Sequence, residues 1–120
     1  MASFTESLQA IARRVPEAEV VMVMGTDGIP IEKLVVRQEP NLEAVAAEYT
    51  TLLRASLQAA SGTGLGQLLE LAIVTERMTA LLAGITPDYF LFIALQPGAL
   101  VGRARYALRV AGIELQKEFV

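Results

Sequence analysis

The chain has 120 residues, of which 53% are hydrophobic and 19% are charged, and its formal net charge is −3 at pH 7. A chain of this length forms one domain, here residues 1–120, and buries enough surface to fold without disulfides or metals. It contains no cysteine and no histidine, which excludes disulfides, thiolate sites and the commonest general base and metal ligand. The hydrophobic fraction exceeds the usual ~45–50%. The excess favours either a large core or an apolar surface closed by a second copy of the chain.

The same figures exclude several classes of partner. An acidic chain with no basic cluster lacks the electrostatic footprint of a nucleic-acid-binding protein. The longest apolar runs, such as residues 89–95, are far shorter than the ~20 residues of a membrane span. Residues 2–15 have no apolar core of the kind found in secretory signals. We therefore expect a soluble, cytoplasmic protein with no catalytic residue, cofactor or metal of its own.

The first predicted elements are a helix and a β-hairpin. Ser3 and Glu6 form a capping box, apolar residues then recur at helical spacing, and Pro16 ends the helix. Residues 19–25 are apolar on both faces, as in a central strand. The turn at residues 26–28 contains Asp-Gly and returns the chain into a second strand.

A long second helix is predicted to begin after Pro40, with Asn41 as its N-cap. It ends in the glycine-containing segment 61–64. Its predicted inner stripe consists of Leu42, Val45, Ala46, Tyr49, Leu52, Leu53, Ser56, Leu57 and Ala60.

Three further strands, at residues 67–74, 78–85 and 89–95, and a final helix to about residue 118 complete the pattern. Gly102 and Gly112 in this helix each cost about 1 kcal/mol relative to alanine, which suggests that something approaches the helix backbone closely. The order α-β-β-α-β-β-β-α with hairpin connections predicts an α/β fold of the α+β class, with an antiparallel sheet sandwiched by helices.

Three stretches in this order resemble the roadblock/dynein light chain family, and most closely its bacterial and archaeal MglB-type regulators of Ras-like GTPases. Residues 23–31 are similar to the family's first hairpin, and residues 64–73 are similar to the entry to its third strand. Residues 89–105 are similar to its last strand and to the Leu-Gly-x-x-Arg start of its last helix, where Val101 replaces the usual Leu.

The resemblance implies a five-stranded antiparallel sheet with the second helix on one face and the terminal helices on the other. It also implies a homodimer in which the sheets join and the second helices lie side by side. In the GTPase regulators, the second-helix region of the dimer engages a small Ras-like GTPase and repositions that partner's own loops, so that the regulator supplies no catalytic residue.

The outer face of the second helix supports an interface independently of the resemblance. A solvated helix face normally carries Lys and Glu, whereas this one carries mainly small residues, which allow close helix approach. Alternatively, the alanines are present for their helix propensity alone. We expect Arg54 to be an ion-pairing residue or interface anchor, in preference to an arginine finger. The candidate interface residues are Ala44, Ala47, Thr51, Arg54, Ala55 and Gln58.

Three function classes follow from these observations. The first is a homodimer that binds a Ras-like GTPase, which leaves open whether it stimulates GTP hydrolysis. The second is a scaffold or light-chain-type adaptor without effect on nucleotide turnover. The third is a small-molecule sensor, which the scarcity of polar residues in the strands disfavours. The segment Gly62-Thr-Gly-Leu-Gly66 is not a phosphate-binding loop, because it leads from a helix into a strand.

Overall fold

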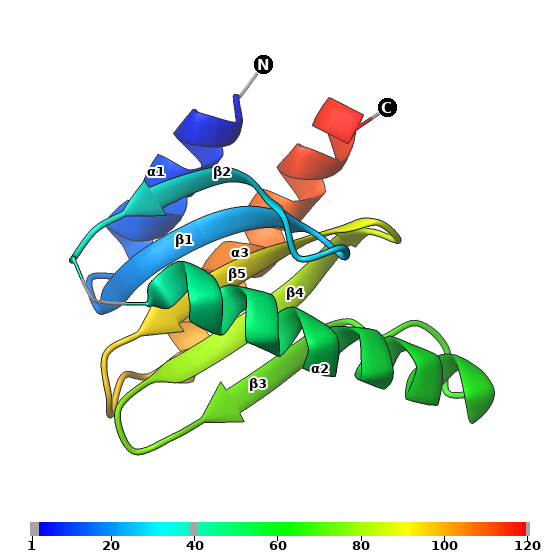
Figure 1. The fold of residues 1–120 in the computed structure, drawn as a ribbon. Helices are drawn as coiled ribbons and strands as arrows, with labels where there is room; N and C mark the ends of the chain where they lie inside the picture. Colours follow the sequence, from blue (N-terminus) through cyan, green and yellow to red (C-terminus); the bar gives the residue numbers. More distant parts are fainter. Residues whose placement is uncertain (1–2, 39–40, 120) are drawn as a thin grey trace.

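The computed structural model describes residues 3–38 and 41–119 and contains three α-helices around one five-stranded sheet (Figure 1). The sheet has the strand order β2-β1-β5-β4-β3, and every neighbouring pair is antiparallel. These findings confirm the expected order and class of elements. The elements are α1 (Phe4–Arg14), β1 (Ala18–Gly25), β2 (Pro30–Val35), α2 (Leu42–Gly62), β3 (Glu70–Val74), β4 (Thr79–Thr86), β5 (Tyr89–Leu95), α3 (Val101–Gln116) and the 3₁₀ turn η1 (Lys117–Phe119).

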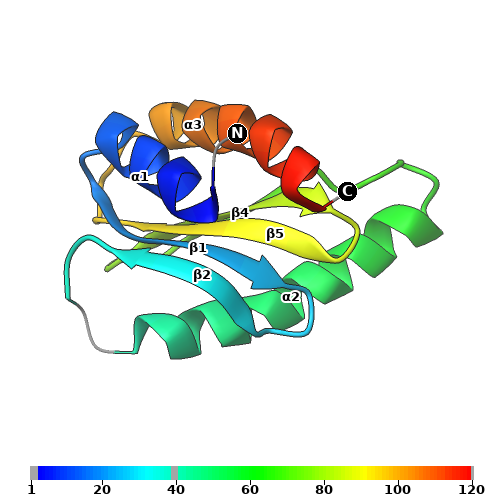
Figure 2. The ribbon, with the colours of Figure 1, turned by 90° about the horizontal axis from the view of Figure 1, so that it is seen from above.

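The sheet separates two layers of helices, with α2 on one face and α1 and α3 together on the other (Figure 2). Strands β1 and β5 lie in the middle of the sheet and are buried on both faces. Alternation along β1 directs Val21 and Val23 into the core under α1 and α3, and Met22 and Met24 into the core under α2. The two methionines therefore fill the core.

Helix α2 follows the predicted range but differs in detail. Asn41 occupies the N-cap position with a left-handed φ of 68°, and its side chain makes no capping hydrogen bond. Thr50 is fully buried, with its hydroxyl donating to the Ala46 carbonyl at 2.7 Å. Leu52, expected in the inner stripe, is 47% exposed. The reason is rotational: the buried line passes through Leu53, and Leu52 lies about 100° away around the helix.

The two glycines of α3 differ in their surroundings. A Cβ atom on Gly112 would lie 3.9 Å from the Gly84 carbonyl oxygen of β4, so the expected close approach is confirmed at this position. A Cβ atom on Gly102 would have no atom of another element within 4 Å, so the expected close approach is wrong at this position. Gly102 is exposed in the first turn of the helix, where the sheet does not reach it.

Substitutions at Gly112 test this packing. We expect Gly112→Ala to stabilise the fold by up to about 1 kcal/mol, since one added carbon fits at ordinary contact distance and helix propensity improves. Gly112→Leu is expected to destabilise it by about 1–3 kcal/mol through overpacking against β4. Urea unfolding measures both effects, with Gly102→Ala and Gly102→Leu as matched controls in open space. Equal effects of leucine at the two positions would contradict the close approach.

Candidate interaction surface

The six candidate residues of α2 all lie on its exposed side. Helix α2 is the one described helix on its face of the sheet (Figure 2), so no other helix covers this surface. At 100° per residue the six positions fall within an arc of about 100°. They form a strip along the helix that we call the α2 outer face. Its residues are Ala44, Ala47, Thr51, Arg54, Ala55 and Gln58, all exposed.

Arg54 is held by the chain itself. Its Nη1 atom donates to the Thr26 carbonyl in the β1–β2 turn at 2.6 Å, and its Nη2 atom lies 3.5 Å from the Thr51 hydroxyl oxygen. The guanidinium therefore ties α2 to the hairpin, through hydrogen bonds and not through an ion pair. This arrangement disfavours an arginine finger, which places its guanidinium on a partner's phosphates. The role of Arg54 as an interface anchor stays a prediction.

The side of α2 that points toward β3 carries an exposed leucine. Glu43 forms an ion pair with Lys33 of β2, which shows which side of the helix faces β2. Leu52 lies nine residues later, about 180° around the helix from Glu43, and so points toward the β3 side. The apolar stripe predicts a core position for Leu52, and this prediction is wrong. The position of Leu52 at the margin of the stripe is the signal that distinguishes it from the buried residues.

The two edges of the sheet differ in how they are protected. Strand β2 begins at Pro30, carries Glu32 and Lys33, and has an irregular register against β1, all of which discourage pairing with another strand. Strand β3 has the sequence Glu-Leu-Ala-Ile-Val with no proline or lysine, and its Val74 is 71% exposed. Strand β3 is the unprotected edge.

Hydrogen bonds at the ends of β3 define which backbone groups face outward. The Leu69 carbonyl accepts from the Gly84 amide, and the Thr75 amide donates to the Met78 carbonyl. Because antiparallel ladders alternate, the odd-numbered residues of β3 face β4. The N–H and C=O groups of Ala72 and Val74 therefore point away from the sheet and are available to another strand.

The start of β3 is joined to α3 by an ion pair in which one donor is shared between two carboxylate oxygens. The Nε atom of Arg105 lies 2.8 and 2.7 Å from the two carboxylate oxygens of Glu70, and both side chains are partly buried. Arg105 is the arginine of the Leu-Gly-x-x-Arg-like segment. The sequence reasoning did not find its partner, because the two residues are 35 positions apart.

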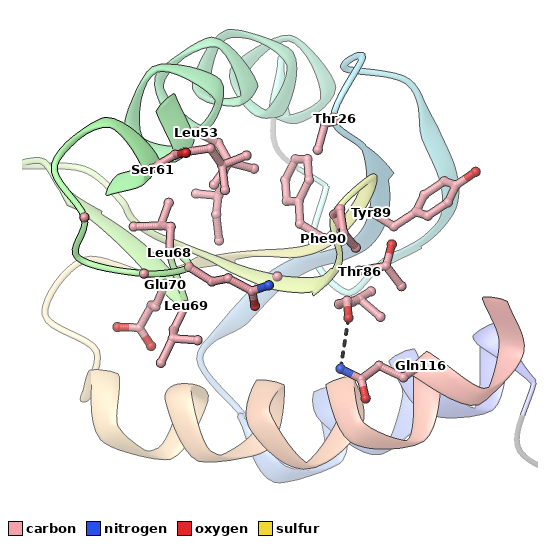
Figure 3. Close-up of a pocket in the computed structure, with 18 residues that line it drawn as sticks. Thr26, Leu53, Ser61, Leu68, Leu69, Glu70, Thr86, Tyr89, Phe90 and Gln116 are labelled. Atoms are coloured by element: carbon pink, nitrogen blue, oxygen red, sulfur yellow. Dashed lines mark hydrogen bonds between the residues drawn. The ribbon is translucent and has the colours of Figure 1, made fainter. Parts of the chain in front are cut away.

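A cavity of about 810 Å³ lies beside this edge, between the C-terminal half of α2 and strands β3, β4 and β5 (Figure 3). Leu53, Leu57 and Phe90 form part of its apolar wall. The segment between α2 and β3 also borders the cavity, with Gly64 and Gly66 at positive φ, which agrees with their predicted role as turn residues. In the same segment Leu65 is 83% exposed, so the apolar surface continues past the strand.

Neither a metal cluster nor a spanning helix is found in residues 3–38 and 41–119. No group of three or more acidic, cysteine or histidine side chains there could hold a metal ion. No helix in the same ranges has the length and hydropathy needed to cross a bilayer.

Solved structures with the same arrangement of helices and strands include a Roadblock/LC7 domain from Streptomyces avermitilis. It superimposes with a TM-score of 0.84 at 12% identity, over 98% of both chains. MglB from Myxococcus xanthus gives a TM-score of 0.81 at 16% identity, also over 98% of both chains. The chain has the roadblock/LC7 fold.

A third solved structure is more similar in sequence than these two. MglC from Myxococcus xanthus is 29% identical over 98% of this chain and 99% of that chain, with a TM-score of 0.70. No family model and no curated protein matches the sequence. The similarity of this chain to MglB proteins therefore lies in its fold.

Proposed function

We propose that the chain is a non-catalytic homodimeric regulator that binds a small Ras-like GTPase in its GTP state and stimulates GTP hydrolysis. The observation that carries the proposal is the α2 outer face, an exposed strip of small residues on a fold shared with MglB proteins. Small exposed residues allow a partner's backbone to approach closely. The cytoplasm is the proposed compartment.

The proposed dimer joins two β3 edges in antiparallel fashion. The outward backbone groups of Ala72 and Val74 would pair with those of the second copy, and Leu52 of each copy would lie at the contact between the two α2 helices. A two-fold axis perpendicular to the sheet places both α2 helices on the same face. Their outer faces then form one continuous platform for a single GTPase.

In this proposal the regulator acts by positioning the loops of its partner. Arg54 stays bonded to the Thr26 carbonyl and contributes no charge to the transition state. The regulator therefore needs no residue that reacts and no cofactor. An adaptor would use the same platform without changing the partner's turnover.

Single-turnover GTP hydrolysis by a Ras-like GTPase from the same source tests the proposal. We expect the chain to accelerate hydrolysis, and Arg54→Ala to retain that acceleration within about tenfold, whereas loss of an arginine finger costs about 10³–10⁵-fold. Binding without acceleration would establish the adaptor. Failure to bind any Ras-like GTPase of that source in the GTP state would refute the proposal.

A further inference from the structure

Helices α1 and α3 lie together on the opposite face of the sheet from α2 (Figure 2). A groove between them forms a second surface. The groove has a volume of about 450 Å³. Small side chains lie along it, among them Ala10 of α1 and, buried at its base, Ala107 and Ala111 of α3. A channel between two packed helices that is floored by alanine accepts the ridge of a third helix, because small residues allow the axes to approach closely.

Charge is segregated along this groove. The end of α1 and the start of α3 lie at the same end of the layer. Arg14 of α1 lies over the Tyr106 ring of α3, with its guanidinium carbon 5.9 Å from the ring centroid. Arg13 is beside it, and Arg103 lies one turn before Ala107 on the same side of α3. The opposite end of the groove carries Glu6 and Glu114, and Glu114 forms an ion pair with Lys117 of η1.

These arginines contrast with the charge of the whole molecule. The net charge is −3, yet α1 and α3 together hold five arginines (two and three) and two glutamates (one each). Within the described ranges no ion pair involves Arg13, Arg14 or Arg103, and all three residues are exposed. The basic end of the groove is therefore available to an acidic group from outside the chain.

We propose that the α1–α3 groove binds an acidic α-helical segment of a second protein partner, with its acidic half over Arg13, Arg14 and Arg103. An apolar ridge on that segment would lie over the alanines between the two helices, and the exposed side chains of Tyr106 and Ile113 on α3 would cover one flank. Shape complementarity and charge complementarity together specify this occupant.

Two other occupants fit less well. A bilayer is flat and would leave the groove unfilled, and Glu6 at the far end would repel an anionic surface. A second copy presents an equivalent concave surface here, so two grooves cannot fill each other. The groove lies across the sheet from the α2 outer face, so this proposal stands independently of GTPase binding.

The test uses the whole chain and a fluorescent synthetic helix of about four turns, ~14 residues, with one leucine stripe and glutamates in one half. A matched peptide carries lysines in place of the glutamates. Fluorescence anisotropy should show binding of the glutamate peptide alone. The affinity should fall as salt rises from about 0.05 to 0.5 M, because salt screens exposed charges.

Variants locate the site. We expect the double variant Arg13→Glu, Arg14→Glu to weaken binding of the glutamate peptide by about 100-fold, or about tenfold per reversed charge. Arg77→Glu reverses an exposed arginine in the β3–β4 turn and should leave the affinity unchanged. The milder pair Arg13→Ala, Arg14→Ala gives a smaller loss and serves if charge reversal affects folding, which thermal unfolding reports.

Three results would overturn the proposal. The first is that both peptides bind equally well, or that neither peptide binds. The second is binding that Arg77→Glu weakens as much as the double variant does. The third is arginine-dependent sedimentation with vesicles of phosphatidylserine and phosphatidylcholine in the absence of peptide binding, which would assign the surface to a membrane. GTPase binding by the double variant should be unchanged. Loss of peptide binding with GTPase binding retained therefore concerns the α1–α3 groove alone, and not the α2 outer face.

Discussion

Replacing Ala72 with proline is expected to abolish self-association of the chain. The Ala72 amide points away from β4, so a proline there leaves the β3–β4 ladder intact and removes an outward donor. Its ring also obstructs an approaching strand. At a protein concentration where the unaltered chain sediments as a dimer, the variant should sediment as a monomer. The apparent dissociation constant should rise by at least about 100-fold, as expected when a central hydrogen-bonded pair of an interface is lost.

Val35→Pro is the matched control on the opposite edge. The Val36 amide donates to the Glu19 carbonyl of β1, so by alternation the Val35 amide faces away from the sheet. Both variants therefore lose an outward donor from an edge strand. A dimer that survives Ala72→Pro and dissociates with Val35→Pro would place the seam at β2.

Adding a negative charge to the α2 outer face is expected to separate GTPase binding from dimerisation. Ala47→Glu or Thr51→Glu places a long charged side chain in the strip of small residues, and should weaken GTPase binding by about 100-fold or more because a buried unpaired charge is costly at an interface. Sedimentation should show that the dimer persists. Both residues are exposed within a helix, so the stability change should stay within about 0.5 kcal/mol.

Glu48→Gln is a suitable control for these variants, because it changes an exposed charge on the same helix outside the strip. If Ala47→Glu or Thr51→Glu instead yields monomers, the outer face is itself the dimer seam. That is the arrangement predicted from the sequence, in which the second helices lie side by side and a glutamate at either position yields monomers. In that case the GTPase would have to bind elsewhere.

The order of helices and strands could be predicted because it depends on local patterns. The apolar run of β1, the Asp-Gly turn and the glycines after α2 each act over a few residues. The rotation of α2 could not be predicted to within one residue, since the side chains of β1 and β5 beneath it determine which residues are buried. Leu52 lies at the margin of the stripe and was assigned to the wrong side for this reason.

The open edge and the groove depend on contacts between residues that are distant in sequence. Nothing local distinguishes β3 from β4, because a strand becomes an edge through the order of the whole sheet. Arg14 and Tyr106 meet only when α1 and α3 pack together. The α2 outer face was identifiable, since a run of small residues along one helix can be read directly; its role remains a prediction.

The central strands have a consequence for cooperativity. Because β1 and β5 are buried on both sides, both helical layers pack against the same two strands. Neither layer can detach without exposing the strands that support the other. The molecule should therefore open as one unit, with its slowest amide exchange in these strands. A ligand on either face then protects amides throughout the chain, by an amount that depends on its concentration relative to its dissociation constant.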